Sequence, residues 1–343
     1  MKREFWFFEG RPGIFRFRYP EIGMTAVLGA FALYFSWLTG APFSLPDLKA
    51  TWFIGFHYSL PLVLAALWLV VALVGLRRRG GGAEDRQRLN RYAWQFLSYF
   101  FTFSAVMILH LNIKLWLPLI TSVRLDRFYY CIDLQLQPLI DAMMTARDVI
   151  ADLAPDHSTS WYLLGFVALF FVSFAYHAVV DKHRLRNVFL AVLFVEAIGP
   201  LTYLLAPALG PFLFDTGLNI SSASNQGIMR EVRLEILENP QWLAQWGPRY
   251  FISGLAAMPS LHAGASWVFV HYAFKFRTPM IPIYLVIYFW IIIEAVATKW
   301  HYLIDLPVGI VLAMLCIFAA ERFCAADPEA QEAEREIAQR RAG

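Results

Sequence analysis

The chain has 343 residues, of which 59% are hydrophobic and only 16% are charged. This composition, with repeated apolar runs of about 20 residues, predicts a polytopic membrane protein and excludes an ordinary soluble fold. The net charge of +3 says little by itself in such a protein, and we expect no nucleic-acid partner. The three cysteines form neither a CxxC pattern nor an even framework, so they indicate neither a zinc site nor structural disulfides.

The N-terminal part predicts a membrane anchor. Residues 1–20 mix basic and aromatic side chains, which is typical of an interfacial segment on the inner leaflet. The apolar run that follows has no small-x-small cleavage site, so we expect an uncleaved anchor and not a signal peptide. Residues 1–343 are interpreted as a single integral all-α membrane domain with about eight transmembrane helices. The expected spans are residues 22–38, 57–76, 92–117, 161–180, 188–205, 258–274, 281–297 and 302–320.

Four polar segments separate or follow these spans. Residues 77–91 are basic and contain a glycine run, which predicts a solvated connector. Residues 123–157 interleave aspartates with leucines and predict an amphipathic helix that lies on the membrane or re-enters it. Residues 207–256 are expected to form an outer loop, residues 258–320 to hold the helices that carry the motifs described below, and residues 321–343 to form a charged cytoplasmic tail.

The distribution of basic residues predicts the orientation of the chain. With a cytoplasmic N-terminus, the inner segments collect about 20 of the 29 Lys and Arg residues and the outer segments about 8. Eight spans with both termini in the cytoplasm satisfy the positive-inside rule at every loop. Under this topology, residues 207–256 lie on the outer face, which is periplasmic, extracellular or luminal.

Two short polar motifs open apolar segments on that outer face. His301 and Asp305 are four residues apart, so on a helix they share one face, and the carboxylate can hold one ring nitrogen and leave the other free. His262 lies at the mouth of another span, and Ser260 offers a hydroxyl near a helix N-terminus, which suits a phosphate. These groups are the ones that phosphoryl transfer through a phosphohistidine requires. A lone His-x-x-x-Asp pair is usually structural, but ionisable groups at membrane depth tend to be functional.

The motifs Pro259-Ser260-Leu261-His262 and His301-x-x-x-Asp305 resemble the second and third signatures of the type 2 phosphatidic acid phosphatase superfamily. Their flanking residues are most similar to the branch that contains inositol phosphorylceramide synthases and their bacterial relatives. The resemblance covers about the last 100 residues and implies the core helical bundle of this superfamily. It also implies that His301 is the nucleophile, Asp305 its orienting partner, and His262 the acid that protonates the leaving group and later acts as the base.

The sequence departs from the phosphatase pattern in its basic residues. The usual Lys, six residues, Arg-Pro signature is missing, because residues 199–214 contain no basic residue. Glu294 and Ala295 replace the Ser-Arg pair expected shortly before the nucleophile, and these departures favour the synthase branch. Cations that hold a phosphate must therefore come from elsewhere. Besides Ser260, the candidate phosphate-binding residues are Lys299, Lys114, Arg249, Arg230 and Arg233, each of which could instead snorkel to lipid headgroups.

The sequence therefore predicts a membrane-embedded lipid phosphotransferase. It would move a phosphate or phosphorylated head group from a lipid phosphate or phospholipid to a hydroxyl acceptor at the outer face of the bilayer. A lipid phosphate phosphatase that uses water as the acceptor is the close alternative, and neither a metal nor a cofactor is expected. The alternative of another class is a lipid or small-solute transporter, but matched halves with broken helices are not visible in the sequence. A vanadate-dependent oxidase is disfavoured by the missing basic residues and by the membrane embedding.

Overall fold

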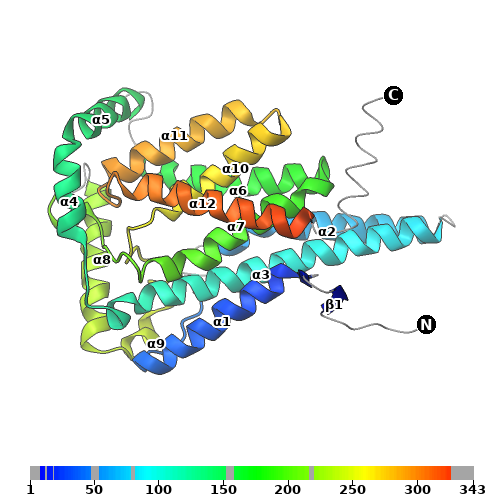
Figure 1. Cartoon of the computed structure of the whole chain (residues 1–343), viewed down its shortest axis with the longest axis horizontal. Helices are drawn as coiled ribbons and strands as arrows, with labels where there is room; N and C mark the ends of the chain where they lie inside the picture. Colours follow the sequence, from blue (N-terminus) through cyan, green and yellow to red (C-terminus); the bar gives the residue numbers. More distant parts are fainter. Residues whose placement is uncertain are drawn as a thin grey trace.

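A computed structural model describes residues 8–11, 14–17, 19–47, 54–78, 82–151, 158–215 and 220–325. Over this part, the chain forms an elongated helical bundle whose long helices run along one axis (Figure 1). This architecture confirms the predicted helical membrane class. One local departure is a short antiparallel pair of strands, β1 (Phe8–Arg11) and β2 (Ile14–Phe17), within the expected interfacial segment. The rest of that segment up to residue 18, and residues 326–343 of the expected tail, lie outside the described residues.

Six of the described helices are long and apolar enough to cross a membrane. They are α1 (Pro20–Thr39), α2 (Ile54–Arg78), α3 (Ala83–Ile120), α6 (Ser158–Val179), α7 (Lys182–Thr202) and α12 (Asp305–Ala325). The other two expected spans correspond to shorter helices, α10 (Leu261–Phe276) and α11 (Ile281–Ala297), of 16 and 17 residues. Each of the eight predicted spans thus coincides with a helix, but only six of these helices reach full spanning length.

The remaining helices gather at one end of the bundle, opposite the end where α2 finishes and α3 begins (Figure 1). The segment predicted to be amphipathic or re-entrant contains α4 and α5, and the expected outer loop contains η1, α8 and α9. Their bounds are Asp126–Gln135 for α4, Gln137–Ala151 for α5, Pro211–Leu213 for η1, Ile220–Glu238 for α8 and Trp242–Trp246 for α9.

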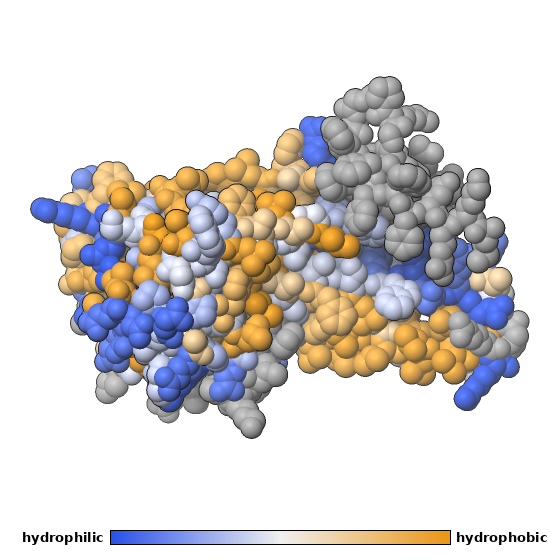
Figure 2. Space-filling view, turned by 90° about the horizontal axis from the view of Figure 1, so that it is seen from below, coloured by the Kyte–Doolittle hydropathy of each residue, from blue (hydrophilic) through white to orange (hydrophobic). Residues whose placement is uncertain are grey.

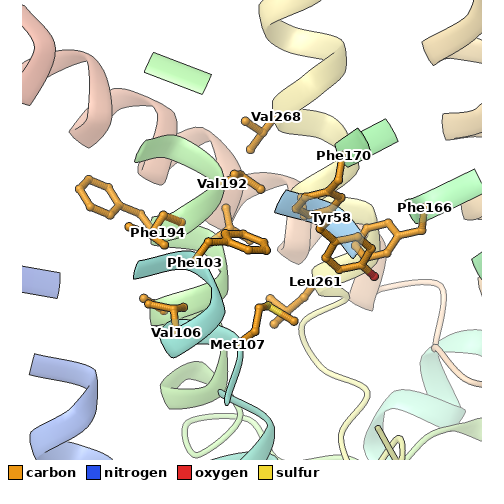
Figure 3. Packing of buried hydrophobic residues seen from close by; sticks show 14 of the residues in the cluster. Tyr58, Phe103, Val106, Met107, Phe166, Phe170, Val192, Phe194, Leu261 and Val268 are labelled. Atoms are coloured by element: carbon orange, nitrogen blue, oxygen red, sulfur yellow. The ribbon is translucent and has the colours of Figure 1, made fainter. Parts of the chain in front are cut away.

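The core of the bundle is rich in aromatic side chains that fill the space between α2, α3, α6 and α7. The rings of Tyr58 and Phe170 are stacked with their centroids 4.3 Å apart, and Phe103 lies against Phe170 at 5.8 Å (Figure 3). α7 is the most enclosed of the six long helices, because α3, α10 and α12 all pack against it. Figure 2 shows broad apolar surface along the bundle, with hydrophilic residues gathered mostly toward its two ends. That surface is expected where helices face lipid tails.

The helices α10 and α12 approach each other unusually closely at their N-terminal ends. A Cβ added to Gly309 would lie 2.1 Å from the carbonyl oxygen of Ser260, and one added to Gly264 would lie 2.6 Å from the carbonyl oxygen of Gly309. Only glycine fits at such a backbone contact. The contact brings the two motifs together, since each motif lies at the start of one of these helices.

Candidate active site

His301 lies in the turn between α11 and α12 and is almost fully buried. Its backbone N–H donates to the carbonyl of Ala295 at 3.1 Å. In its ring, Nδ1 is 2.8 Å from the carbonyl oxygen of Ala257 and 3.3 Å from Oδ2 of Asp305. A carbonyl can only accept, so Nδ1 carries the hydrogen and the neutral ring keeps its lone pair on Nε2.

Asp305 is the first residue of α12, and its side chain is completely buried. Oδ2 also accepts the backbone N–H of Tyr302 at 2.9 Å. The pair therefore meets across a turn, and the expectation that His301 and Asp305 share one helix face is corrected. The backbone carbonyl of Asp305 accepts the N–H of Ser260 at 3.0 Å, which ties the two motifs together.

His262 occupies the first turn of α10, and its ring centroid lies 6.2 Å from that of His301. Its ring packs between Tyr162 and Phe166 of α6, with centroids 5.2 and 4.4 Å away. The side chain is half-buried and lies within electrostatic range of Lys114. The two imidazole rings thus meet edge to face, one in the first turn of α10 and the other in the turn before α12.

Ser260 is the N-cap residue of α10. Its Oγ accepts the backbone N–H of Ala263 at 3.4 Å, and the residue is fully buried. This contact satisfies one of the free N–H groups at the start of the helix. The hydroxyl is therefore occupied in capping, while its predicted role in phosphate binding stays a prediction.

Two of the candidate cations are linked to the histidine pair, Lys114 by its electrostatic interaction with His262 and Lys299 by its place in the sequence. Lys114, on α3, is half-buried and has its Nζ 5.8 Å from the ring centroid of Tyr203, in electrostatic range of Glu196 and His262. Lys299 is two residues before His301, and its Nζ lies 3.7 Å from Oδ2 of Asp215.

The three candidate arginines have separate surroundings. Arg230 donates to the carbonyl of Phe212, and the Arg249 guanidinium lies 5.9 Å from the ring centroid of Tyr250. Arg233 instead faces Arg124 across a small surface cavity whose wall includes Ala256. Burial lowers the pKa of the Arg233 guanidinium and the charge of Arg124 lowers it further, while Asp126 opposes this.

The cavity is lined by a residue next in sequence to a hydrogen-bond partner of His301. Ala256 lines it, and the next residue, Ala257, provides the carbonyl that accepts from His301. Among the described residues, neither Arg124 nor Arg233 forms an ion pair within 4 Å, and only Arg233 was a candidate from the sequence. Two like charges around a cavity favour an anion between them.

An arginine on α5 lies beside the position where the Ser-Arg pair was expected and this sequence has no arginine. Nε of Arg147, on α5, is 3.0 Å from Oε1 of Glu294, which is fully buried near the end of α11. Glu294 replaces a residue of the expected Ser-Arg pair, and its neighbour Ala295 accepts the backbone N–H of His301. Nothing in the local sequence around Arg147 indicates this contact, because it joins residues 147 positions apart.

Two aspartates of α4 were also missed as site residues. Asp126 and Asp133 are buried, and both accept hydrogen bonds from the segment that follows His301. The alternation of aspartates with leucines in this segment was visible, but it predicted only an amphipathic helix. No group of three or more His, Cys, Asp or Glu side chains in the described ranges is arranged to hold a metal ion.

A family model described as the PAP2 superfamily matches residues 132–319, which is more than half of the chain. The matched range begins within α4, ends within α12 and includes both histidine motifs. No curated protein and no solved structure matches the chain.

Proposed function

Because the chain belongs to the PAP2 superfamily, whose members are phosphatases or phosphotransferases, we propose that it transfers a phosphate or phosphorylated head group from a lipid to a hydroxyl acceptor. The superfamily match and the apolar helices support the general part of this proposal, which is that the chain is a multi-pass membrane enzyme acting on lipid phosphates. The observation that carries the proposed phosphohistidine chemistry is the arrangement of His301, whose Nδ1 is held by two oxygens while Nε2 remains available.

The proposed reaction has two steps. Nε2 of His301 attacks phosphorus, the bond from phosphorus to the leaving oxygen breaks, and His262 gives its proton to that oxygen. Asp305 and the Ala257 carbonyl stabilise the positive charge that develops on the ring of His301. The acceptor hydroxyl then gives its proton to His262 and attacks phosphorus, so that the N–P bond breaks and both histidines return to their first state.

The negative charge of the phosphoryl group requires fixed cations and N–H donors. Lys114 and Lys299 are the best-supported cations, because the first is in electrostatic range of His262 and the second is two residues from His301. Arg233 is supported by the cavity that it lines together with Arg124 and Ala256, while the proposals for Arg230 and Arg249 rest on the sequence alone. For Ser260 we propose that the start of α10 contributes through its N–H groups.

The choice of acceptor rests on the resemblance to the inositol phosphorylceramide synthase branch, which favours an alcohol over water. The topology supports an outer-face site, since the start of α1 and the end of α12 lie at one end of the bundle and α4, α8 and α9 at the other (Figure 1). With the basic residues concentrated on the inner side, the proposal places both termini in the cytoplasm and the active site on the outer face of the membrane. We also propose that residues 1–343 form a single integral membrane domain.

The test is an assay of purified full-length protein in detergent, with a panel of phospholipids and lipid phosphates, with and without alcohol acceptors. We expect head-group or phosphate transfer by the wild type, complete loss in His301→Ala, and an acid-labile phosphoenzyme absent from that variant. His183→Ala, which changes an exposed histidine at the start of α7, is the matched control and should behave as wild type. Full activity of His301→Ala would reject the phosphohistidine, and release of phosphate at a rate independent of alcohol would replace the transferase by a phosphatase.

A further inference from the structure

Two buried aspartates on one face of α4 hold the segment that carries His301. Asp126 and Asp133 are seven residues apart, which is two helical turns, so both side chains lie on the same face. They are only 4% and 6% exposed, although most of the other residues of this helix are not buried. Aspartates are almost never fully buried unless they are paired or hydrogen-bonded.

Their partners are backbone and side-chain donors next to His301. Oδ1 of Asp133 accepts the N–H of Leu303 at 3.0 Å. Oδ1 of Asp126 accepts the hydroxyl of Tyr302, also at 3.0 Å. The backbone N–H of the same Tyr302 donates to Asp305, which is the hydrogen-bond partner of His301. Tyr302 alone therefore links α4 to Asp305.

Asp126 also holds a second segment against the first. The same Oδ1 accepts the backbone N–H groups of Leu209 and Gly210 at 2.9 and 3.0 Å. Gly210 has a φ of +134°, and an added Cβ would lie 2.7 Å from the carbonyl oxygen of Trp300. The segment around Gly210 therefore lies directly on the backbone that precedes His301, and only glycine permits this approach.

Further backbone contacts extend this arrangement to both sides of His301. The N–H of Phe212 donates to the carbonyl of Lys299 at 3.1 Å, and the N–H of Ala257 donates to the carbonyl of Ala208 at 2.8 Å. Lys299 itself has a φ of +58°, in the left-handed region that a residue with a side chain rarely adopts. Such a conformation persists only where the surrounding contacts enforce it.

We propose that Asp126 and Asp133 are positioning residues that fix His301 for attack on phosphorus without touching the substrate. The inference rests on the proposed function, because it assigns these residues to that same site. His301 lies in a turn, so no regular helix determines the direction of its ring. A displacement of about 1 Å at a reacting atom can lower a rate about 100-fold, which makes such support necessary.

The experiment compares variants of the full-length protein in detergent. Asp126→Ala and Asp133→Ala remove the acceptors, Asp126→Asn and Asp133→Asn keep Oδ1 as an acceptor, and Asp141→Ala changes an exposed aspartate on α5 as the control. We expect each alanine variant to lower kcat by about 10- to 100-fold with KM changed less than about threefold. The asparagine variants should recover most of this loss, and Asp141→Ala should match the wild type. The inhibition constant of inorganic phosphate, used as a probe of the binding site, should stay unchanged.

Three results would overturn the inference: wild-type kcat in both alanine variants, a rise in KM that accounts for the whole effect, or asparagine variants as impaired as the alanine ones. Where Asp126→Ala fails to fold, Tyr302→Phe decides, since it removes only the hydroxyl that donates to Asp126. It should lower kcat about threefold to tenfold, and an unchanged kcat would reject the role of Asp126. Activity in His301→Ala would reject the proposed function itself, whereas an inactive His301→Ala beside a fully active Asp126→Ala would reject only the positioning role.

Discussion

The middle of the bundle and the end that carries His301 are held together by different forces. In the middle, aromatic and aliphatic side chains such as Phe103, Phe170 and Phe174 fill space between helices, and their contacts have little direction. At the end, the carboxylates of Asp126, Asp133 and Asp305 hold particular N–H and O–H groups. Side-chain packing in the middle should therefore determine the free energy of unfolding. Hydrogen-bond geometry at the end that carries His301 should determine the rate of the reaction.

The largest expected effect on the rate comes from Asp305→Ala. Loss of the carboxylate leaves the imidazolium of His301 without its negative partner, so kcat should fall by about 10³-fold or more. Because the change is at the hydrogen-bonded end, thermal unfolding in detergent should shift much less than for a large core substitution. Initial rates and an unfolding curve on the same preparation test this, and a variant with normal kcat would contradict the role of Asp305.

The matching change in the middle is Phe170→Ala. Phe170 is fully buried against Tyr58 and Phe269, so its removal should leave a cavity and lower the free energy of unfolding by about 4 kcal/mol. The folded fraction should keep its kcat, because no residue of the histidine pair contacts Phe170 directly. Denaturant titration in detergent measures the loss, and the exposed Phe171→Ala on the same helix is the control. A stability equal to that of the control would contradict the importance of this aromatic packing.

An ion pair tests the boundary between the two regions. Arg147→Gln leaves the buried Glu294 without its partner, which should lower the free energy of unfolding by about 3 kcal/mol. The double variant Arg147→Gln with Glu294→Gln should regain most of that stability, because no unpaired charge remains. A double-mutant cycle of unfolding energies measures the coupling. Additive effects of the two single changes would show that the pair contributes nothing.

The smallest expected effect is a pH dependence at Asp133. Burial and the charge of Asp305 raise the pKa of the Asp133 carboxyl to about 6, while the N–H of Leu303 and Lys299 lower it. Tyr130 and Tyr302 also lie within its electrostatic range. The folded state then binds a proton that the unfolded state has lost, so this group's contribution to stability declines as pH rises from about 4 to about 6.

The control for this effect is Asp133→Asn, which cannot titrate. The Tm of the wild type minus that of the variant should decrease between pH 4 and pH 6 and stay level above about pH 7. Measuring both proteins in one buffer series removes the contributions of all other groups. A constant or increasing difference over that interval would contradict the raised pKa.

Much of the helical architecture could be predicted because it depends on local composition. Every predicted span coincides with a helix, since about 20 apolar residues in a row have few alternatives in a bilayer. The two strands near the N-terminus were missed, whereas α11 has the predicted bounds and α10 lies within three residues of its predicted ones. The stretch around β1 and β2 mixes basic and aromatic residues, and that composition does not distinguish an interfacial helix from a hairpin.

The candidate site was only half visible in the sequence. Its motifs contain His262, His301 and Asp305 at positions whose side chains the fold brings together. The sequence lacked the arginine expected near residue 294, and the fold brings Arg147 there from another helix. Short motifs reveal the reacting groups, because each motif spans only a few consecutive residues. The groups that support them come from distant parts of the chain.

By itself, the sequence determined a helical membrane protein with two histidine motifs, since hydropathy and residue type are properties of short segments. Only the tertiary structure decided that α4 holds the turn of His301 and that Gly264 and Gly309 bring two helix starts together. The hydrogen bond from Tyr302 to Asp126 joins residues 176 positions apart. Such a contact exists only after the whole bundle has packed, because no local preference of either residue selects the other as its partner.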